Sequence, residues 1–89
     1  MRYFFNVRSL ERLVRDLEGA EYATLEDARS EALSIARELI GRQLIRGEAV
    51  DWGAIVEFER EDGEAAGAVG FLEAAGLPSA SAPAEIPPQ

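Results

Sequence analysis

The side chains of this chain that are suited to chemistry are mostly carboxylates, and the first group of them lies around Gly19. Asp16, Glu18 and Glu21 stand close together there, and carboxylate oxygens on a turn are the ligands that Ca²⁺ and Mg²⁺ prefer. Their spacing does not match the oxygen pattern of an EF-hand loop, and Asp and Glu are most often solvated surface residues. We therefore expect no metal here, and we expect Asp16 to fix the turn by accepting backbone N–H groups.

A second group of carboxylates includes Glu57 and Glu59, two residues apart on one face of a predicted strand. Two carboxylates can divide acid and base roles when a pocket drives their pKa values apart, but a strand next to a hairpin turn offers little enclosure. The chain has no histidine, cysteine or lysine, so the usual general bases, thiolate nucleophiles and Schiff-base amines are absent. We expect a protein that is not an enzyme, with no catalytic residue, metal or cofactor.

The basic residues are nine arginines, and four of them lie near the N-terminus: Arg2, Arg8, Arg12 and Arg15. Together with Tyr3 or Phe4 they could hold phosphates while an aromatic ring stacks on a base. The net charge of −8 and the pI near 4.4 oppose this, because nucleic acids and anionic membranes attract basic surfaces. We expect neither as a partner. No segment has the length and apolarity of a membrane span or a signal peptide, so the expected compartment is the cytoplasm.

The elements that would position these groups can be read from periodicity. Arg2–Arg8 alternates, with Tyr3, Phe5 and Val7 on one side, and is predicted to be a strand. Leu10–Tyr22 has two readings. Its leucines fit helical spacing, but Gly19 interrupts it, so we favour a short strand at Leu13–Asp16, a turn, and an extended approach at Ala20–Tyr22.

The clearest element is a helix over Leu25–Arg46. Thr24 is a good N-cap, Asp27 follows three residues later, and Gly47 is suited to end the helix in the left-handed conformation. Gly41, inside the helix, is expected to mark a bend or a close packing contact. An apolar stripe along the helix predicts burial against a sheet.

A hairpin is predicted from Ala54–Arg60 and Ala65–Phe71, with Asp62-Gly63 as a two-residue type I′ loop. That loop places Phe58 opposite Gly67 and Val56 opposite Val69. Because all four prolines follow residue 77, residues 1–76 are expected to form one domain and residues 77–89 a disordered tail rich in Pro, Ala and Ser.

These elements predict an α+β fold of β-β-α-β-β order, an antiparallel sheet of three to four strands with one helix packed on one face. One helix cannot cover both faces of the sheet. Apolar residues on the other face would then form an association surface.

Four segments together resemble a family of short bacterial proteins, a domain of unknown function: RYFFNVR, DLEGAEY, TLEDARSEALSIARELI and DWGAIVEFEREDG. The resemblance covers Arg2 to about Ala75 and implies the same fold, without an established activity. That family usually has a histidine where this chain has Asn6, so no role resting on an imidazole is expected here. The opening of the helix is also similar to that of Hic-type antitoxins, which normally carry a longer N-terminal sheet.

The sequence therefore favours a non-catalytic cytoplasmic interaction module that self-associates as a homodimer, through the uncovered sheet face or a sheet edge. A domain this small gains stability from self-association. The residues expected at the surface are Phe4, Ile55 and Trp52 as apolar contacts, with Arg2, Asn6 and Arg8 as their polar surroundings. The alternative is an acidic, antitoxin-like inhibitor that neutralises a basic protein.

Overall fold

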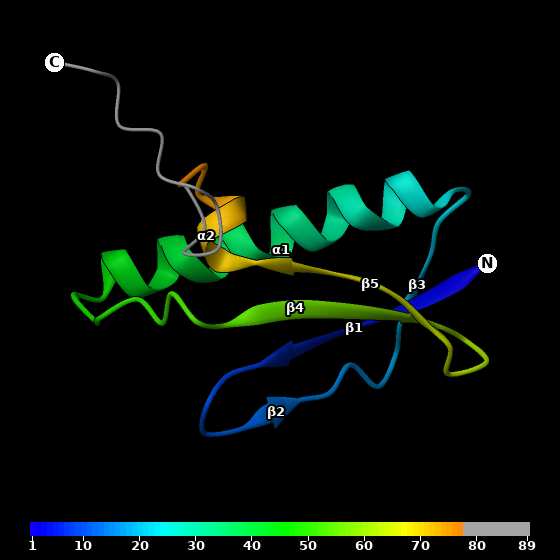
Figure 1. Ribbon diagram of the computed structural model, residues 1–89, viewed down its shortest axis with the longest axis horizontal. Coiled ribbons are helices and arrows are strands. Elements are labelled where there is room, and N and C mark those ends of the chain that lie inside the picture. The colour runs from blue at the N-terminus through cyan, green and yellow to red at the C-terminus, as the bar shows by residue number, and fades with distance from the viewer. Residues whose placement is uncertain (78–89) are drawn as a thin grey trace, which may run out of the picture.

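The computed structural model describes residues 1–77. Its elements, in chain order, are β1 (Arg2–Arg8), β2 (Leu13–Val14), β3 (Ala20–Glu21), α1 (Leu25–Ile45), β4 (Ile55–Arg60), β5 (Ala65–Gly70) and α2 (Phe71–Ala74). The strands form one antiparallel sheet of order β2-β1-β4-β5, and β3 also pairs with β1. Helix α1 lies along one side of this sheet (Figure 1). The predicted α+β fold and its element order are confirmed.

The segment between β1 and α1 forms strands rather than a helix. It contributes β2 and β3, both paired with β1, so the sheet has five strands instead of the expected three to four. Gly19 has a φ of 69°, a left-handed conformation that interrupts a helix. The favoured reading of Leu10–Tyr22 is therefore confirmed, with shorter strands than expected.

The core lies between α1 and the inner face of the sheet. Tyr3 and Phe5 of β1 meet Val56 and Phe58 of β4 and Val69 of β5, and all five are buried. Three alanines of α1, one turn apart, are completely buried against them: Ala28, Ala32 and Ala36. Because an alanine side chain is a single methyl group, the helix backbone can approach the sheet closely.

Both ends of α1 have the predicted caps. The Thr24 hydroxyl oxygen accepts the backbone N–H of Asp27 at 3.0 Å. At the other end Gly47 has a φ of 71° and donates to Leu44, while Glu48 donates to Gln43. These two bonds are those of a Schellman motif. The expectation for Gly41 is not supported by packing, since a Cβ built there would have no neighbouring atom within 4 Å.

The hairpin joins β4 and β5 by a different loop from the one predicted. A type I′ turn needs a positive φ at both central residues, and Gly63 has one (87°) whereas Asp62 does not. The backbone bonds from Gly63 to Arg60 and from Arg60 to Glu64 instead define a three-residue loop. The Asp62 carboxylate accepts the Glu64 N–H at 2.9 Å, which is a local bond available without the left-handed conformation.

The predicted register beyond this loop is nevertheless confirmed. Phe58 pairs with Gly67 and Val56 with Val69, because the register shifts by one residue between Phe58 and Glu59. A three-residue loop displaces the pairing by one residue, and a β-bulge in β5 restores it. The burial of Val56 and Phe58 thus selects the register that the turn by itself does not give.

The expected second strand of the hairpin ends one residue early. Phe71, predicted as its last residue, instead begins α2, where it is buried together with Ala74. Gly76 has a φ of 76° and ends this short helix. Apart from Leu77, the tail predicted over residues 77–89 lies outside the described residues.

Candidate interaction surface

Asp16 and Asn6 join the segment between β2 and β3 to β1. The Asp16 carboxylate accepts the backbone N–H groups of Glu18 and Gly19 at 3.1 Å each, and that of Phe5 in β1, also at 3.1 Å. The Asn6 side-chain oxygen accepts the Asp16 N–H at 2.9 Å. Asp16 therefore fixes the turn as predicted. Asn6, expected at an outer contact surface, is only 6% exposed, and its side chain binds the backbone of its own chain instead.

These contacts also determine the ionisation of Asp16. Burial raises the pKa of its carboxyl, but the N–H groups of Gly19, Phe5 and Glu18 stabilise the ionised form and outweigh burial, so the pKa lies below its ordinary value. Asp16 is thus a charged structural group at near-neutral pH. Within residues 1–77, no three Asp, Glu, His or Cys side chains are grouped closely enough to hold a metal ion.

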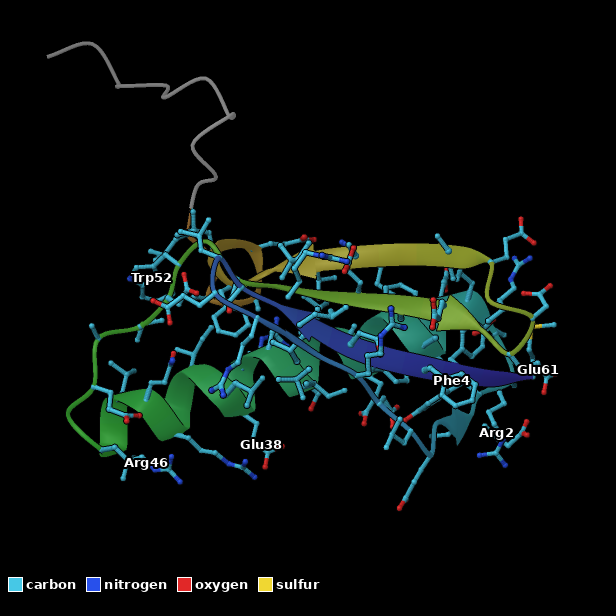
Figure 2. All side chains as sticks on the ribbon, turned by 90° about the horizontal axis from the view of Figure 1, so that it is seen from below. Arg2, Phe4, Glu38, Arg46, Trp52 and Glu61 are labelled. Atoms are coloured by element: carbon cyan, nitrogen blue, oxygen red, sulfur yellow. The ribbon has the colours of Figure 1, made fainter. Side chains whose placement is uncertain are left out.

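Arg2 and Phe4 lie at the same end of the sheet, near the turn at Gly19 (Figure 2). The Arg2 guanidinium donates to the Glu18 carbonyl at 2.9 Å and lies 3.7 Å from the Glu21 carboxylate. A Cβ built on Gly19 would lie 3.0 Å from the Phe4 ring. The ring of Phe4 is therefore half-buried against its own chain.

Ile55 and Arg8 lie at the opposite end of the outer face, the sheet face turned away from α1. They are paired across β1 and β4, and the Arg8 side chain contacts the Glu57 carboxylate at 2.7 Å. Phe4 and Ile55 are separated by four residue steps along the strands, roughly 13 Å. Phe4 and Ile55 thus do not form one continuous apolar patch, because the pair Asn6 and Glu57 lies between them.

Trp52 lies before β4 and is 39% exposed. Figure 2 shows it at the other end of the molecule from Phe4 and Arg2. The outer face also has a cavity of about 140 Å³, which polar residues such as Asn6, Arg15 and Glu59 line in part. That volume is below the usual range for ligand sites. Five of the six predicted residues are therefore distributed over two ends of the molecule, and the sixth, Asn6, is buried between them.

The edge formed by β5 is the feature that the site prediction did not specify. Within residues 1–77, β4 is the strand that pairs with β5, and no strand lies on the other side of β5. Its sequence is Ala-Ala-Gly-Ala-Val-Gly, with no charge and no proline. Charged residues and proline usually protect a free sheet edge from pairing. Their absence from this segment was the signal in the sequence that could have identified the edge.

Comparison with known proteins gives one family. The sequence pattern described as "Domain of unknown function (DUF6894)" matches residues 2–72 of the chain. No curated protein and no solved structure matches it. Among the described residues, no helix has both the length and the apolar character needed to cross a membrane.

Proposed function

The chain belongs to the family described as a domain of unknown function, DUF6894, and we propose that it is a non-catalytic interaction module that pairs with a second copy of itself through the edge of β5. Of the two surfaces that the sequence suggested, the outer face and a sheet edge, the geometry favours the edge. Phe4 lies two strands away from it and Ile55 one strand away.

The backbone groups of β5 support this proposal. Phe71 donates its N–H to the Ala54 carbonyl at 3.0 Å, so the pair formed by these two residues is hydrogen-bonded. In an antiparallel ladder, hydrogen-bonded and non-hydrogen-bonded pairs alternate. The N–H and C=O groups of Ala68 and Gly70 are therefore directed away from β4, toward the free edge, where another strand can pair with them.

The side chains along β5 also allow a close approach. Ala68 is exposed on the outer face, Gly67 has no side chain, and the side chain of Val69 is buried in the core. The bulge near Ala66 limits the regular part of the edge to the end nearer Gly70. A two-fold antiparallel pairing centred on Ala68 would use residues 67–69 of each copy, which lie in this regular part, and would extend the sheet across both copies.

The small size of this edge contact determines the affinity that we expect for the dimer. A pair of six-residue strands is small beside the roughly 1,200–2,000 Å² of a stable interface, so we expect dissociation in the micromolar range. Each copy carries a net charge of −8, and the two copies repel each other. Salt screens this repulsion, so the dimer should strengthen as the salt concentration rises.

Sedimentation equilibrium at tens of micromolar, at low and at high salt, tests the proposal. Ala68→Lys places two like charges directly opposite each other in the paired edges and should weaken the dimer by about tenfold or more. Within one copy the introduced lysine faces Glu57, the cross-strand partner of Ala68, so the fold should be retained. Ala23→Lys, at an exposed position before α1, is the matched control.

A wild-type protein that remains monomeric at these concentrations and high salt would overturn the proposal. Equal dimerisation by wild type and Ala68→Lys would place the contact elsewhere. Far-UV circular dichroism of both variants separates a lost contact from a lost fold.

The alternative function, an acidic antitoxin-like inhibitor of a basic protein, rests on the net charge of −8 and on acidic residues near the hairpin turn, where Figure 2 shows Glu61 at the tip. In this case a basic protein would form a complex with the monomer at low salt and dissociate as salt increases. The opposite salt dependence separates the two proposals.

A further inference from the structure

A cleft of about 500 Å³ lies between the C-terminal end of α1, the loop after β1 and the start of β4. Its volume is within the range of small-molecule sites in proteins. It does not involve the free edge used in the proposed function, so the two can be tested separately. Figure 2 shows Arg46, one of its lining residues, at the end of α1.

Apolar side chains from separate elements line part of this cleft. They are Val7 of β1, Val14 of β2, Leu39 of α1, Ala54 before β4, and Phe71 of α2. Ala54 and Phe71 are buried in the core, and Val7 and Leu39 pack against it. An apolar group of a ligand can therefore be removed from water in a place that the fold itself keeps formed.

Charged side chains of both signs line the same cleft. Arg12 and Arg46 bring positive charge, and Glu48 and Asp51 bring negative charge. Within the described part of the chain, none of these four forms an ion pair. A third arginine, Arg42, is bound to Glu38 at 2.8 Å. The cleft thus offers separate donors and acceptors around an apolar surface.

We propose that this cleft binds a small zwitterion with an apolar side chain, the chemistry of an apolar α-amino acid. Its carboxylate would bind the arginines, its ammonium the two acidic residues, and its side chain the apolar lining. A simple anion would meet Glu48, Asp51 and the net charge of −8. A simple cation would meet Arg12 and Arg46. An uncharged apolar molecule would remove water from all four charges without compensation.

Gln43 supports a ligand that carries donors. It lines the cleft, and its Oε1 atom is buried without a hydrogen-bond partner among the described residues. A buried acceptor without a donor is unfavourable. Turning this carboxamide toward the cleft would let a ligand ammonium donate to it. The negative end of the α1 dipole lies at the same place and favours an ammonium there.

Titration of the full chain with L-phenylalanine, followed by backbone-amide NMR and calorimetry up to millimolar concentration, tests this inference. Three analogues isolate its parts: phenethylamine lacks the carboxylate, hydrocinnamate lacks the ammonium, and glycine lacks the apolar group. We expect the affinity of each analogue to be lower than that of phenylalanine by about tenfold or more, because each analogue omits a charge-assisted or apolar contact.

Two variants identify the residues. Arg46→Gln and Glu48→Gln should each weaken phenylalanine binding by about tenfold. Arg15→Gln and Glu61→Gln make the same changes at exposed positions outside the cleft and should leave it unchanged. No shift at the amides that line the cleft would overturn the proposal. So would hydrocinnamate or phenethylamine binding as tightly as phenylalanine, or an equal loss in the cleft and control variants.

Discussion

The side-chain oxygen of Asn6 accepts the backbone N–H of Asp16 at 2.9 Å, and Asp16 in turn accepts the N–H of Phe5, the residue before Asn6, at 3.1 Å. This reciprocal contact gives the Phe5 N–H a hydrogen-bond acceptor on the edge of β1 that faces away from β4, where no continuous strand pairs with β1. β2 and β3 pair with the two ends of β1, and Asp16 bridges the gap between them. On this side of the sheet the edge strands β2 and β3 have only two residues each, whereas β5, the edge strand on the other side, has six.

Removing the Asp16 carboxylate should destabilise the protein. Asp16→Ala leaves the backbone N–H groups of Phe5, Glu18 and Gly19 without their acceptor. We expect a loss of about 2–3 kcal/mol in the free energy of unfolding, measured by urea denaturation. Glu11→Ala, at an exposed position nearby, is the control and should change stability little. Equal stability of the two variants would contradict this structural role.

The same carboxylate should contribute to acid unfolding. Its folded-state pKa lies below the ordinary 3.8, so its stabilising contribution is complete above that value. The contribution is lost as the pH falls through the lower folded-state pKa. We expect the difference in unfolding free energy between wild type and Asp16→Asn to shrink over this acidic window. A difference that stays constant from near-neutral pH into that window would contradict the expectation.

Two glycines of similar surroundings should respond oppositely to alanine. A Cβ on Gly41 or on Gly47 would meet no atom within 4 Å, but Gly47 has a φ of 71°. Gly41→Ala should stabilise the protein by about 1 kcal/mol, because alanine favours a helix interior. Gly47→Ala should cost about 1 kcal/mol, because a side chain disfavours the left-handed conformation. Thermal unfolding measures both, and changes of the same sign would contradict this account.

Gly67 should tolerate alanine poorly because of Phe58. A Cβ on Gly67 would lie 2.6 Å from the Phe58 ring, which is 2% exposed and cannot swing into solvent. We expect Gly67→Ala to cost about 2 kcal/mol, measured by urea denaturation. Gly70→Ala is the control on the same strand, since its Cβ would find Ile55 at an ordinary 3.9 Å.

A double-mutant cycle checks the cause of that cost. In a Phe58→Leu background the smaller side chain leaves room for a methyl group on Gly67, so the cost of Gly67→Ala should fall. An unchanged cost would mean that the backbone of β5, rather than the ring, opposes the substitution.

Tyr22 should ionise later than a free tyrosine. Burial raises the pKa of its hydroxyl, and so do the charge of Glu31 and a hydrogen bond to that carboxylate. The stabilising contribution of neutral Tyr22 is thus present below the ordinary pKa of 10.0 and is lost as the pH rises through the folded-state value. The tyrosinate absorbance that disappears in Tyr22→Phe follows this ionisation. Glu31→Gln should move it to lower pH, and no movement would contradict the role of Glu31.

The sequence by itself determined the long helix, the strands and their order, but not the short helix α2. The two-residue alternation of Arg2–Arg8, the caps Thr24 and Gly47 and the apolar stripe of α1 are local signals, and each one depends on residues within a few positions of one another. The prediction that Asp16 fixes the turn is confirmed for the same reason, because two of the three N–H groups that donate to its carboxylate belong to Glu18 and Gly19, which are close to it in the chain.

The hairpin shows where local signals were insufficient. The Asp-Gly dipeptide suggested a two-residue loop, but a three-residue loop followed by a bulge gives the same register for Phe58 and Val56. Both solutions bury the same side chains. The choice between them depends on backbone conformations and cross-strand contacts that a dipeptide pattern does not contain.

The tertiary structure alone decided what lies on the surface. It buried Asn6 through a bond to Asp16, ten residues away in the chain, and separated Phe4 from Ile55. Among the described residues, it also left the side of β5 that faces away from β4 without a pairing strand. It also brought Arg12, Arg46, Glu48 and Asp51 around one cleft. Burial and proximity of this kind arise from contacts between residues distant in the chain, so periodicity and spacing cannot specify them.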